Sequence, residues 1–148
     1  MLIKGKDLDS LLLKPEATLG QAIIKMNSTK YKITFIAGQK KFFLGTLSDG
    51  DIRRALAEGA TLASKIIKYF NKKPFIIKKK SKKFNNIKSI KKMFFEKDIF
   101  SIPIIDSNKI VGFYDIRDFL SQNSNKSLVL IMAGGFGKRL MPLTRKIP

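Results

Sequence analysis

Apolar residues recur at helical spacing in two stretches of the chain, one in each half. Three positions, spaced three and four residues apart, carry the pattern in both: Leu19, Ala22 and Met26, and later Ile87, Ile90 and Phe94. This spacing places apolar side chains on one face of a helix. We therefore predict helices over residues 19–27 and 86–96.

The polar and apolar runs after each helix also follow a common order. Each half has an apolar strand, a short polar turn, a second strand and then a second helix. The predicted strands cover 33–37 and 42–47 in the first half and 100–105 and 110–114 in the second. The second helices begin near Asp49 and Asp115, since a carboxylate favours a helix N-terminus, and Gly59 is expected to end the first of them.

A repeat of about 67 residues accounts for this shared order. Residues 45–53 align without gaps on residues 112–120, so Gly45 matches Gly112, Ser48 matches Asp115 and Asp51 matches Asp118. Between the copies, residues 62–70 read as a helix and 74–77 as a short strand. Two copies are too few for a solenoid. The simpler interpretation is two α/β units that close on a shared core.

The repeated pattern resembles a tandem pair of CBS domains, the cystathionine-β-synthase regulatory module. The glycine, hydrophobic, hydrophobic, Ser, x, x, Asp stretch at 45–51, its second copy at 112–118 and the strand at 102–106 carry the resemblance. It implies an α/β (α+β) fold of two β-α-β-β-α units packed as a pseudo-twofold pair. We place the first repeat at 1–62 and the second at 63–123.

The resemblance also implies a ligand. CBS pairs commonly bind adenosine-type nucleotides between their units, with the hydroxyl at the phosphate and the carboxylate at the ribose. Those roles map to Ser48 and Asp51, and they suit the chemistry of a helix N-terminus and of a carboxylate. In the second copy Asp118 matches the ribose residue, but Asp115 replaces the hydroxyl and would repel phosphate. We expect one competent site and a second that is weak, empty or nucleoside-like.

Two other interpretations of these residues stay open. Ser48, Asp49, Asp115 and Asp118 are also the residue types that cap helices. The pair would then be a dimerisation scaffold without a ligand. CBS pairs often form dimers through exposed apolar helices, so the resemblance implies a homodimer in either case.

Composition narrows the possible chemistry. The 148 residues include no Cys and no His. Disulfides, thiolate or imidazole metal ligands and Ser-His or Cys-His catalytic arrangements are therefore excluded. No apolar run reaches the roughly 20 residues of a membrane span, and the N-terminus lacks the features of a signal peptide. We expect a cytoplasmic protein with no membrane contact.

The formal charge is +19, with 25 Lys and 5 Arg. Thirteen of the lysines fall within residues 65–97, where Glu96 is the only acid. Such a run favours a polyanion or nucleic-acid partner. However, aromatic residues do not interleave with it as single-strand binding requires. We keep binding of a polyanion or nucleic acid through this segment as an alternative, but the main interpretation includes no nucleic-acid partner.

The last twenty residues have a different pattern. Residues 128–133 are continuously apolar, as in a strand buried on both faces, and Gly134, Gly135 and Gly137 follow at once. Glycine turns after a strand present backbone N–H groups to phosphates. Met132 and Arg139 break a Walker A pattern, and Leu140 breaks the dinucleotide fingerprint.

This ending resembles the signature of the sugar-phosphate nucleotidyltransferases, or nucleotide-sugar pyrophosphorylases. Residues 134–144 match Gly-Gly-x-Gly-x-Arg-Leu-x-Pro-Leu-Thr at every fixed position. The resemblance implies that Gly134, Gly135 and Gly137 cradle a nucleoside triphosphate and that Arg139 is catalytic at the transferring phosphoryl group. Residues 124–148 would then be a linker and the first strand and loop of a Rossmann-like domain.

The remainder of that enzyme, including its Mg²⁺ ligand and its sugar pocket, would lie beyond Pro148. We therefore expect a regulatory module at the N-terminus of a longer enzyme. That parent enzyme would use Mg²⁺, a nucleoside triphosphate and a sugar 1-phosphate. The present fragment alone is expected to have no catalytic activity and no metal site.

Overall fold

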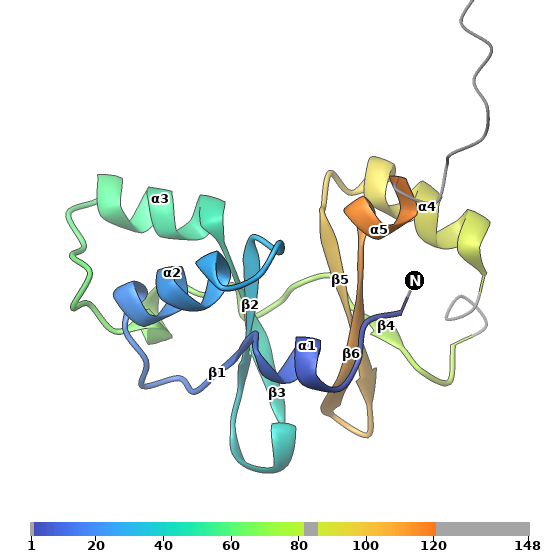
Figure 1. Ribbon diagram of the computed structural model, residues 1–148, viewed down its shortest axis with the longest axis horizontal. Helices are drawn as coiled ribbons and strands as arrows, with labels where there is room; N and C mark the ends of the chain where they lie inside the picture. The colour runs from blue at the N-terminus through green and yellow to red at the C-terminus, as the bar shows by residue number, and fades with distance from the viewer. Residues whose placement is uncertain (1, 82–85, 121–148) are drawn as a thin grey trace, which may run out of the picture.

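The computed structural model describes residues 2–81 and 86–120 (Figure 1). The first half contains α1 (Lys6–Asp9), β1 (Leu12–Leu13), α2 (Leu19–Asn27), β2 (Ile33–Ala37), η1 (Gln39–Lys41), β3 (Phe43–Ser48), α3 (Asp49–Ala57) and η2 (Ile66–Lys68). The second half contains β4 (Ile77–Lys78), α4 (Ile87–Glu96), β5 (Ser101–Asp106), β6 (Lys109–Asp115) and α5 (Ile116–Leu120).

Each half forms a three-stranded sheet with the same topology. β1 pairs in parallel with β2, and β2 pairs antiparallel with β3. β4, β5 and β6 repeat this order. Ile36 pairs with Gly45 and Ile104 with Gly112, so the repeat offset is 68 residues before the hairpin turn and 67 after it. The first hairpin is therefore one residue longer than the second.

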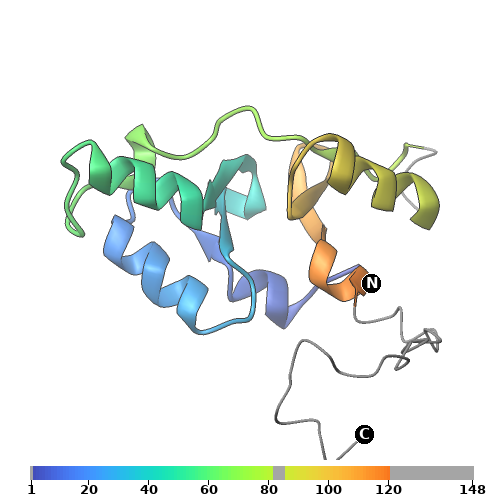
Figure 2. The ribbon, with the colours of Figure 1, turned by 90° about the horizontal axis from the view of Figure 1, so that it is seen from above.

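Helices cover the outer faces of the two sheets, and the inner faces pack on each other (Figures 1 and 2). Ile36 and Leu47 pack under α2 and α3, while Ile102 and Ile104 pack in the corresponding core of the second half. A third core joins the halves and includes Phe35 and Phe113, whose ring centroids are 4.8 Å apart. The arrangement is helix, sheet, sheet, helix.

The segment that precedes each half crosses to the sheet of the other half. Ile3 bridges to Phe113 on β6, and Asn71 bridges to Thr46 on β3. A Cβ atom at Gly45 would lie 2.2 Å from the carbonyl oxygen of Asn71, and one at Gly112 would lie 2.7 Å from that of Ile3. These two close crossings explain why both copies of the repeat have glycine at this position.

Most predicted elements are confirmed within one residue. The exceptions lie in the connections. α1 was not predicted. The leading strand that the β-α-β-β-α pattern implies, for which no residues were given, is β1, and the strand predicted over 74–77 is β4 at Ile77–Lys78. The helix predicted over 62–70 is wrong, because only the short 3-10 helix η2 forms there.

Backbone pairing with the start of α2 explains the missing helix. The carbonyl groups of Leu62 and Ser64 accept N–H bonds from Gly20 and Leu19, and the N–H of Ile66 donates to Ala17. Groups that would bond within a helix are thus used between segments. Tertiary pairing overrides the local helical pattern here.

No helix in residues 2–81 or 86–120 is both long enough and apolar enough to cross a membrane.

Candidate functional site

A cleft of about 790 Å³ lies between the two halves. The first motif contributes Ser48, Asp49, Gly50 and Asp51, and the loop after α4 contributes residues 98–101. The connection between the halves adds Asn71, Pro74 and Phe75. This volume is in the range of small-molecule sites.

Ser48 and Asp51 meet at the N-terminus of α3 as a capping box. The Ser48 hydroxyl donates to Asp51 Oδ2 at 2.6 Å, and the Ser48 N–H donates to the same oxygen at 2.8 Å. The N–H of Asp51 in turn donates to Ser48 Oγ at 3.2 Å. The sequence-based cap interpretation is thus confirmed for these two residues, and both also face the cleft.

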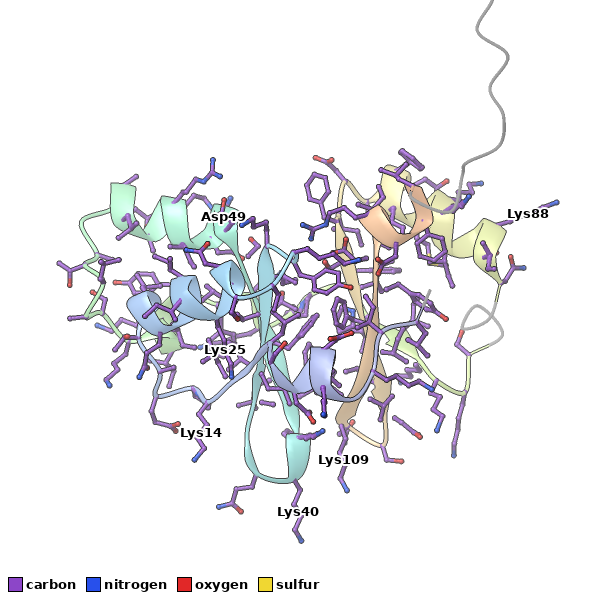
Figure 3. All side chains as sticks on the ribbon, in the orientation of Figure 1. Lys14, Lys25, Lys40, Asp49, Lys88 and Lys109 are labelled. Atoms are coloured by element: carbon purple, nitrogen blue, oxygen red, sulfur yellow. The ribbon has the colours of Figure 1, made fainter. Side chains whose placement is uncertain are left out.

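Charged side chains surround this helix end. Arg54 forms an ion pair with Asp51, and Arg53 forms one with Asp49. Figure 3 shows Asp49 at the end of α3 nearest the second half. Lys32 also lines the cleft and is exposed. Arg117 and Asp98 line the cleft as well. Four cationic side chains therefore face three carboxylates, and this small excess and the positive end of the helix favour an anion here.

Apolar side chains form the other part of the cleft. Pro74 and Phe75 come from the connection, and Ile99 and Phe100 come from the loop after α4. Phe100 is 67 % exposed, so its ring is open to a ligand. The cleft therefore joins a charged end to an apolar end.

The corresponding residues of the second copy have a different environment. The Asp115 side chain is fully buried and accepts bonds from Arg117 Nε at 2.7 Å, Arg117 Nη2 at 2.9 Å and the Ser101 hydroxyl at 2.6 Å. Asp118 Oδ1 accepts from Lys30 Nζ at 2.6 Å, and its Oδ2 accepts from the Tyr31 hydroxyl at 3.3 Å. Neither Asp115 nor Asp118 lines the cleft.

These contacts shift the pKa values of three partners. The hydrogen bond to Asp118 raises the pKa of Lys30. Burial, and then the charge of Asp118, raises the pKa of Tyr31. The hydrogen bond to Asp115 raises the pKa of Arg117. The structure thus holds all three groups in their protonated forms.

Sequence patterns alone did not single out Lys30, Tyr31, Arg117 or Phe75. Both Lys30 and Tyr31 lie in a loop after a helix, upstream of the stretch at 45–53 on which the repeat was aligned. The matched helix positions Leu19 and Ile87 differ by 68 residues, and this offset pairs Tyr31 with Ile99 and Lys30 with Asp98. The different residue types in these two pairs were the sequence feature that could have pointed to Tyr31 and Lys30.

Gly134, Gly135, Gly137 and Arg139, the predicted transferase loop, lie outside the described residues. Within residues 2–81 and 86–120, no three carboxylates come close enough together to hold a metal ion.

No protein-family model matches the chain. Two curated relatives are uncharacterised proteins. One, from Rickettsia prowazekii, is 30% identical over 115 residues, which is 74% of this chain and 33% of the relative. Another, from Helicobacter pylori, is 26% identical over 129 residues, which is 81% of this chain and 37% of the relative. The chain spans about a third of the length of these relatives.

Solved structures of CBS-domain proteins are similar to the described fold. The CBS domains of a Streptococcus pneumoniae transcriptional regulator superpose with a TM-score of 0.64 at 16% identity, over 81% of this chain and 93% of that one. An acetoin utilization protein (AcuB) from Vibrio cholerae gives 0.66 at 18%, over 82% and 90%. A Pyrobaculum aerophilum CBS domain protein solved with AMP gives 0.62 at 17%, over 73% and 81%. The described part of this chain therefore has the fold of a tandem pair of CBS domains.

Proposed function

We propose that this CBS pair is a regulatory module that binds one adenosine-type nucleotide in the cleft at Ser48 and Asp51. The observation that supports this function most strongly is the position of the capping box. It presents a hydroxyl, a carboxylate and a helix N-terminus to a cleft that also has cationic and apolar walls. The phosphate would lie toward Ser48, Lys32 and Arg53, and the base would lie against Phe75 and Ile99.

The hydrogen bonds of Asp51 suggest how the ribose would bind. A carboxylate has about four acceptor positions. Three are used, by the N–H and hydroxyl of Ser48 and by Arg54. If the Ser48 hydroxyl turns to donate to a phosphate, a second position on Asp51 becomes free. The two positions would then match the two ribose hydroxyls.

Ligand analogues test this geometry without altering the protein. We expect AMP to raise the thermal midpoint, as a ligand of the folded state does, and 2′,3′-dideoxy-AMP to bind about tenfold or more weakly, since hydrogen bonds to a charged acceptor are lost. Asp51→Asn should abolish this preference, while Asp106→Asn, on the hairpin far from the cleft, should retain it. Equal binding of both analogues would contradict the role of Asp51.

The same titrations separate the two alternatives. A ligand-free scaffold would show no shift with AMP, ATP, GTP or CTP at millimolar concentration. A polyanion binder would instead take up DNA or RNA with an affinity that falls steeply with salt. Figure 3 shows Lys88, one of the lysines of the 65–97 segment, on α4. No described lysine of that segment lines the cleft, so polyanion binding there would not block the AMP position directly.

We further propose that the module regulates a sugar-phosphate nucleotidyltransferase in the cytoplasm. The motif at 134–144 supports this parent enzyme, which would convert a nucleoside triphosphate and a sugar 1-phosphate into a nucleotide sugar and pyrophosphate with Mg²⁺. Gly134, Gly135 and Gly137 would bind the triphosphate, and Arg139 would act on the transferred group. Pyrophosphate release by the full-length protein, and its loss in Arg139→Ala, is the test.

A homodimer is the proposed assembly. Large apolar side chains are exposed on the outer helices, including Ile24 on α2 (72 % exposed) and Phe95 on α4 (71 % exposed). Light scattering on the 148-residue chain should give twice the monomer mass, and Ile24→Lys with Phe95→Lys should give the monomer. A monomeric wild type would contradict the dimer.

A further inference from the structure

Tyr31 belongs to the first half but lies beside the second motif, residues 112–118, where a ligand of that motif would bind. It follows α2, it is 6 % exposed, and its ring packs edge-on against Phe113 with centroids 5.0 Å apart. Its hydroxyl donates to Asp118 Oδ2 at 3.3 Å. Asp118 is the residue that matches the ribose acceptor Asp51, so a hydroxyl of the chain itself occupies this carboxylate.

Lys30 and Arg117 complete the arrangement. The Lys30 ammonium group lies 2.6 Å from Asp118 Oδ1, so both oxygens of the carboxylate are contacted by the first half. Arg117 donates to both oxygens of Asp115 and also to the carbonyl oxygen of Lys30. Its guanidinium group lies 5.4 Å from the centre of the Tyr31 ring. The three side chains thus form one connected network.

Among the described residues, the open cleft has no equivalent network. Before the hairpin the repeat offset is 68, so Ile99 corresponds to Tyr31 and Asp98 to Lys30. After the hairpin the offset is 67, so Gly50 corresponds to Arg117. Ile99, Asp98 and Gly50 all line the open cleft, and so does Arg117, whereas Lys30 and Tyr31 do not. Isoleucine has no hydroxyl, Asp98 has the same charge as Asp51, and glycine has no side chain.

We propose that Tyr31, Lys30 and Arg117 are a built-in occupant of the second site, so that the pair binds one nucleotide per chain. The hydroxyl and the ammonium group replace the donors that a ribose would offer to Asp118, and Arg117 neutralises Asp115. That the excluded ligand is a nucleotide rests on the function proposed above. That Tyr31 occupies the second site does not depend on that function and can be tested separately.

Exchange of the corresponding residues tests the number of sites. By calorimetric titration, wild type should bind one AMP per chain. The double variant Lys30→Asp/Tyr31→Ile copies the open half at two of the three positions. It should bind one AMP plus one adenosine, because Asp118 loses its two donors from the first half, while Asp115, which is bound to Arg117, offers no hydroxyl to a phosphate. Ile99→Tyr is the matched reverse change and should weaken AMP binding at least tenfold. Two AMP per wild-type chain, or a folded double variant without a second site, would overturn the proposal.

A double-mutant cycle decides the contact without any nucleotide. Tyr31→Phe retains the ring, and Asp118→Asn retains the shape of the acceptor. If the hydroxyl occupies Asp118, the two changes should be non-additive in the unfolding equilibrium constant by about fivefold. Additive effects would overturn the occupancy, even if AMP binds. If wild type binds no nucleotide but the cycle shows coupling, the proposed function fails while the occupied second site stands.

Discussion

At the start of α3, Ser48 and Asp51 pair with each other and face an open cleft. At the start of α5, the matching Asp115 is fully buried against Arg117, and Asp118 is bound by Lys30 and Tyr31. The backbone topology of the two halves is the same. The difference arises from a few side chains. Gly50 at the open motif corresponds to Arg117 at the closed one, and Ile99 beside the open motif corresponds to Tyr31 beside the closed one.

This comparison shows how a duplicated fold becomes asymmetric. Replacing a hydroxyl by the buried carboxylate of Asp115 introduces a charge that needs a partner in the protein interior. Arg117 supplies that partner and adds bulk where Gly50 leaves space. One substitution therefore requires another, and together they convert a possible binding position into a structural contact between the halves.

The largest predicted effect concerns the glycine that both halves share. Gly45→Ala should lower the free energy of unfolding by about 3 kcal/mol, because its Cβ would overlap the Asn71 carbonyl and the crossing segment has to shift. Gly112→Ala should cost less, since its Cβ meets Ile3 near the chain end at 2.7 Å. Urea denaturation measures both.

Gly50→Ala is the control for this pair, because its nearest new contact is 3.7 Å away. It should not lower the unfolding free energy, because Gly50 lies in α3 and alanine favours a helix more than glycine does. A similar loss in all three variants would show that the close crossings are not the reason for the glycines.

The second prediction concerns the buried carboxylate. Asp115→Ala should lower the free energy of unfolding by about 2 kcal/mol, since Ser101 loses its acceptor and Arg117 loses its ion pair. Thermal or urea unfolding at neutral pH measures the loss. Arg117 is partly exposed and can turn toward water, so Arg117→Ala, which leaves a buried charge unpaired, should be the more damaging change. The reverse order would contradict this account.

Local patterns predicted most of the fold. The strands β2 and β3 and the helix α2 have apolar residues at their own periodicities, and each is completed by neighbours close in the chain. The segment at 62–70 has the same kind of pattern, yet its backbone bonds to residues 17–20. Nothing in the pattern of 62–70 itself specifies that pairing, so the prediction failed there.

The candidate site was partly predictable for a similar reason. The repeat brings out Ser48, Asp51 and Asp118, because all three lie in the stretch that aligns without gaps. Tyr31 acts on Asp118 from 87 residues away along the chain. Such a contact depends on how the two sheets pack, and a search for motifs within one copy does not reveal it.

A smaller effect is expected at the open half. Ser48→Ala should lower the free energy of unfolding by about 1 kcal/mol, the usual cost of removing an N-cap hydroxyl. Ser48→Thr retains the hydroxyl and should restore most of that loss. Urea unfolding of the two variants beside Asp115→Ala would show whether the open motif contributes less stability than the buried one. Equal losses at Ser48 and Asp115 would remove the contrast between the halves.

The smallest predicted effect is a pH dependence confined to the closed half. The folded state raises the pKa of Tyr31 above its ordinary value of about 10, chiefly through burial. A raised pKa means that the folded protein holds the proton more tightly than the unfolded chain. The resulting stability is present below about pH 10 and is lost as the pH rises through the folded-state pKa. The raised pKa of Lys30 acts in the same direction.

Wild type should therefore lose stability in alkali more steeply than Tyr31→Phe, as measured by urea unfolding. The ultraviolet absorbance of tyrosinate, compared between these two proteins, should show that Tyr31 ionises above about pH 10. Ionisation at or below the ordinary value would mean that Tyr31 is open to water, and the difference between the two halves would then lie elsewhere.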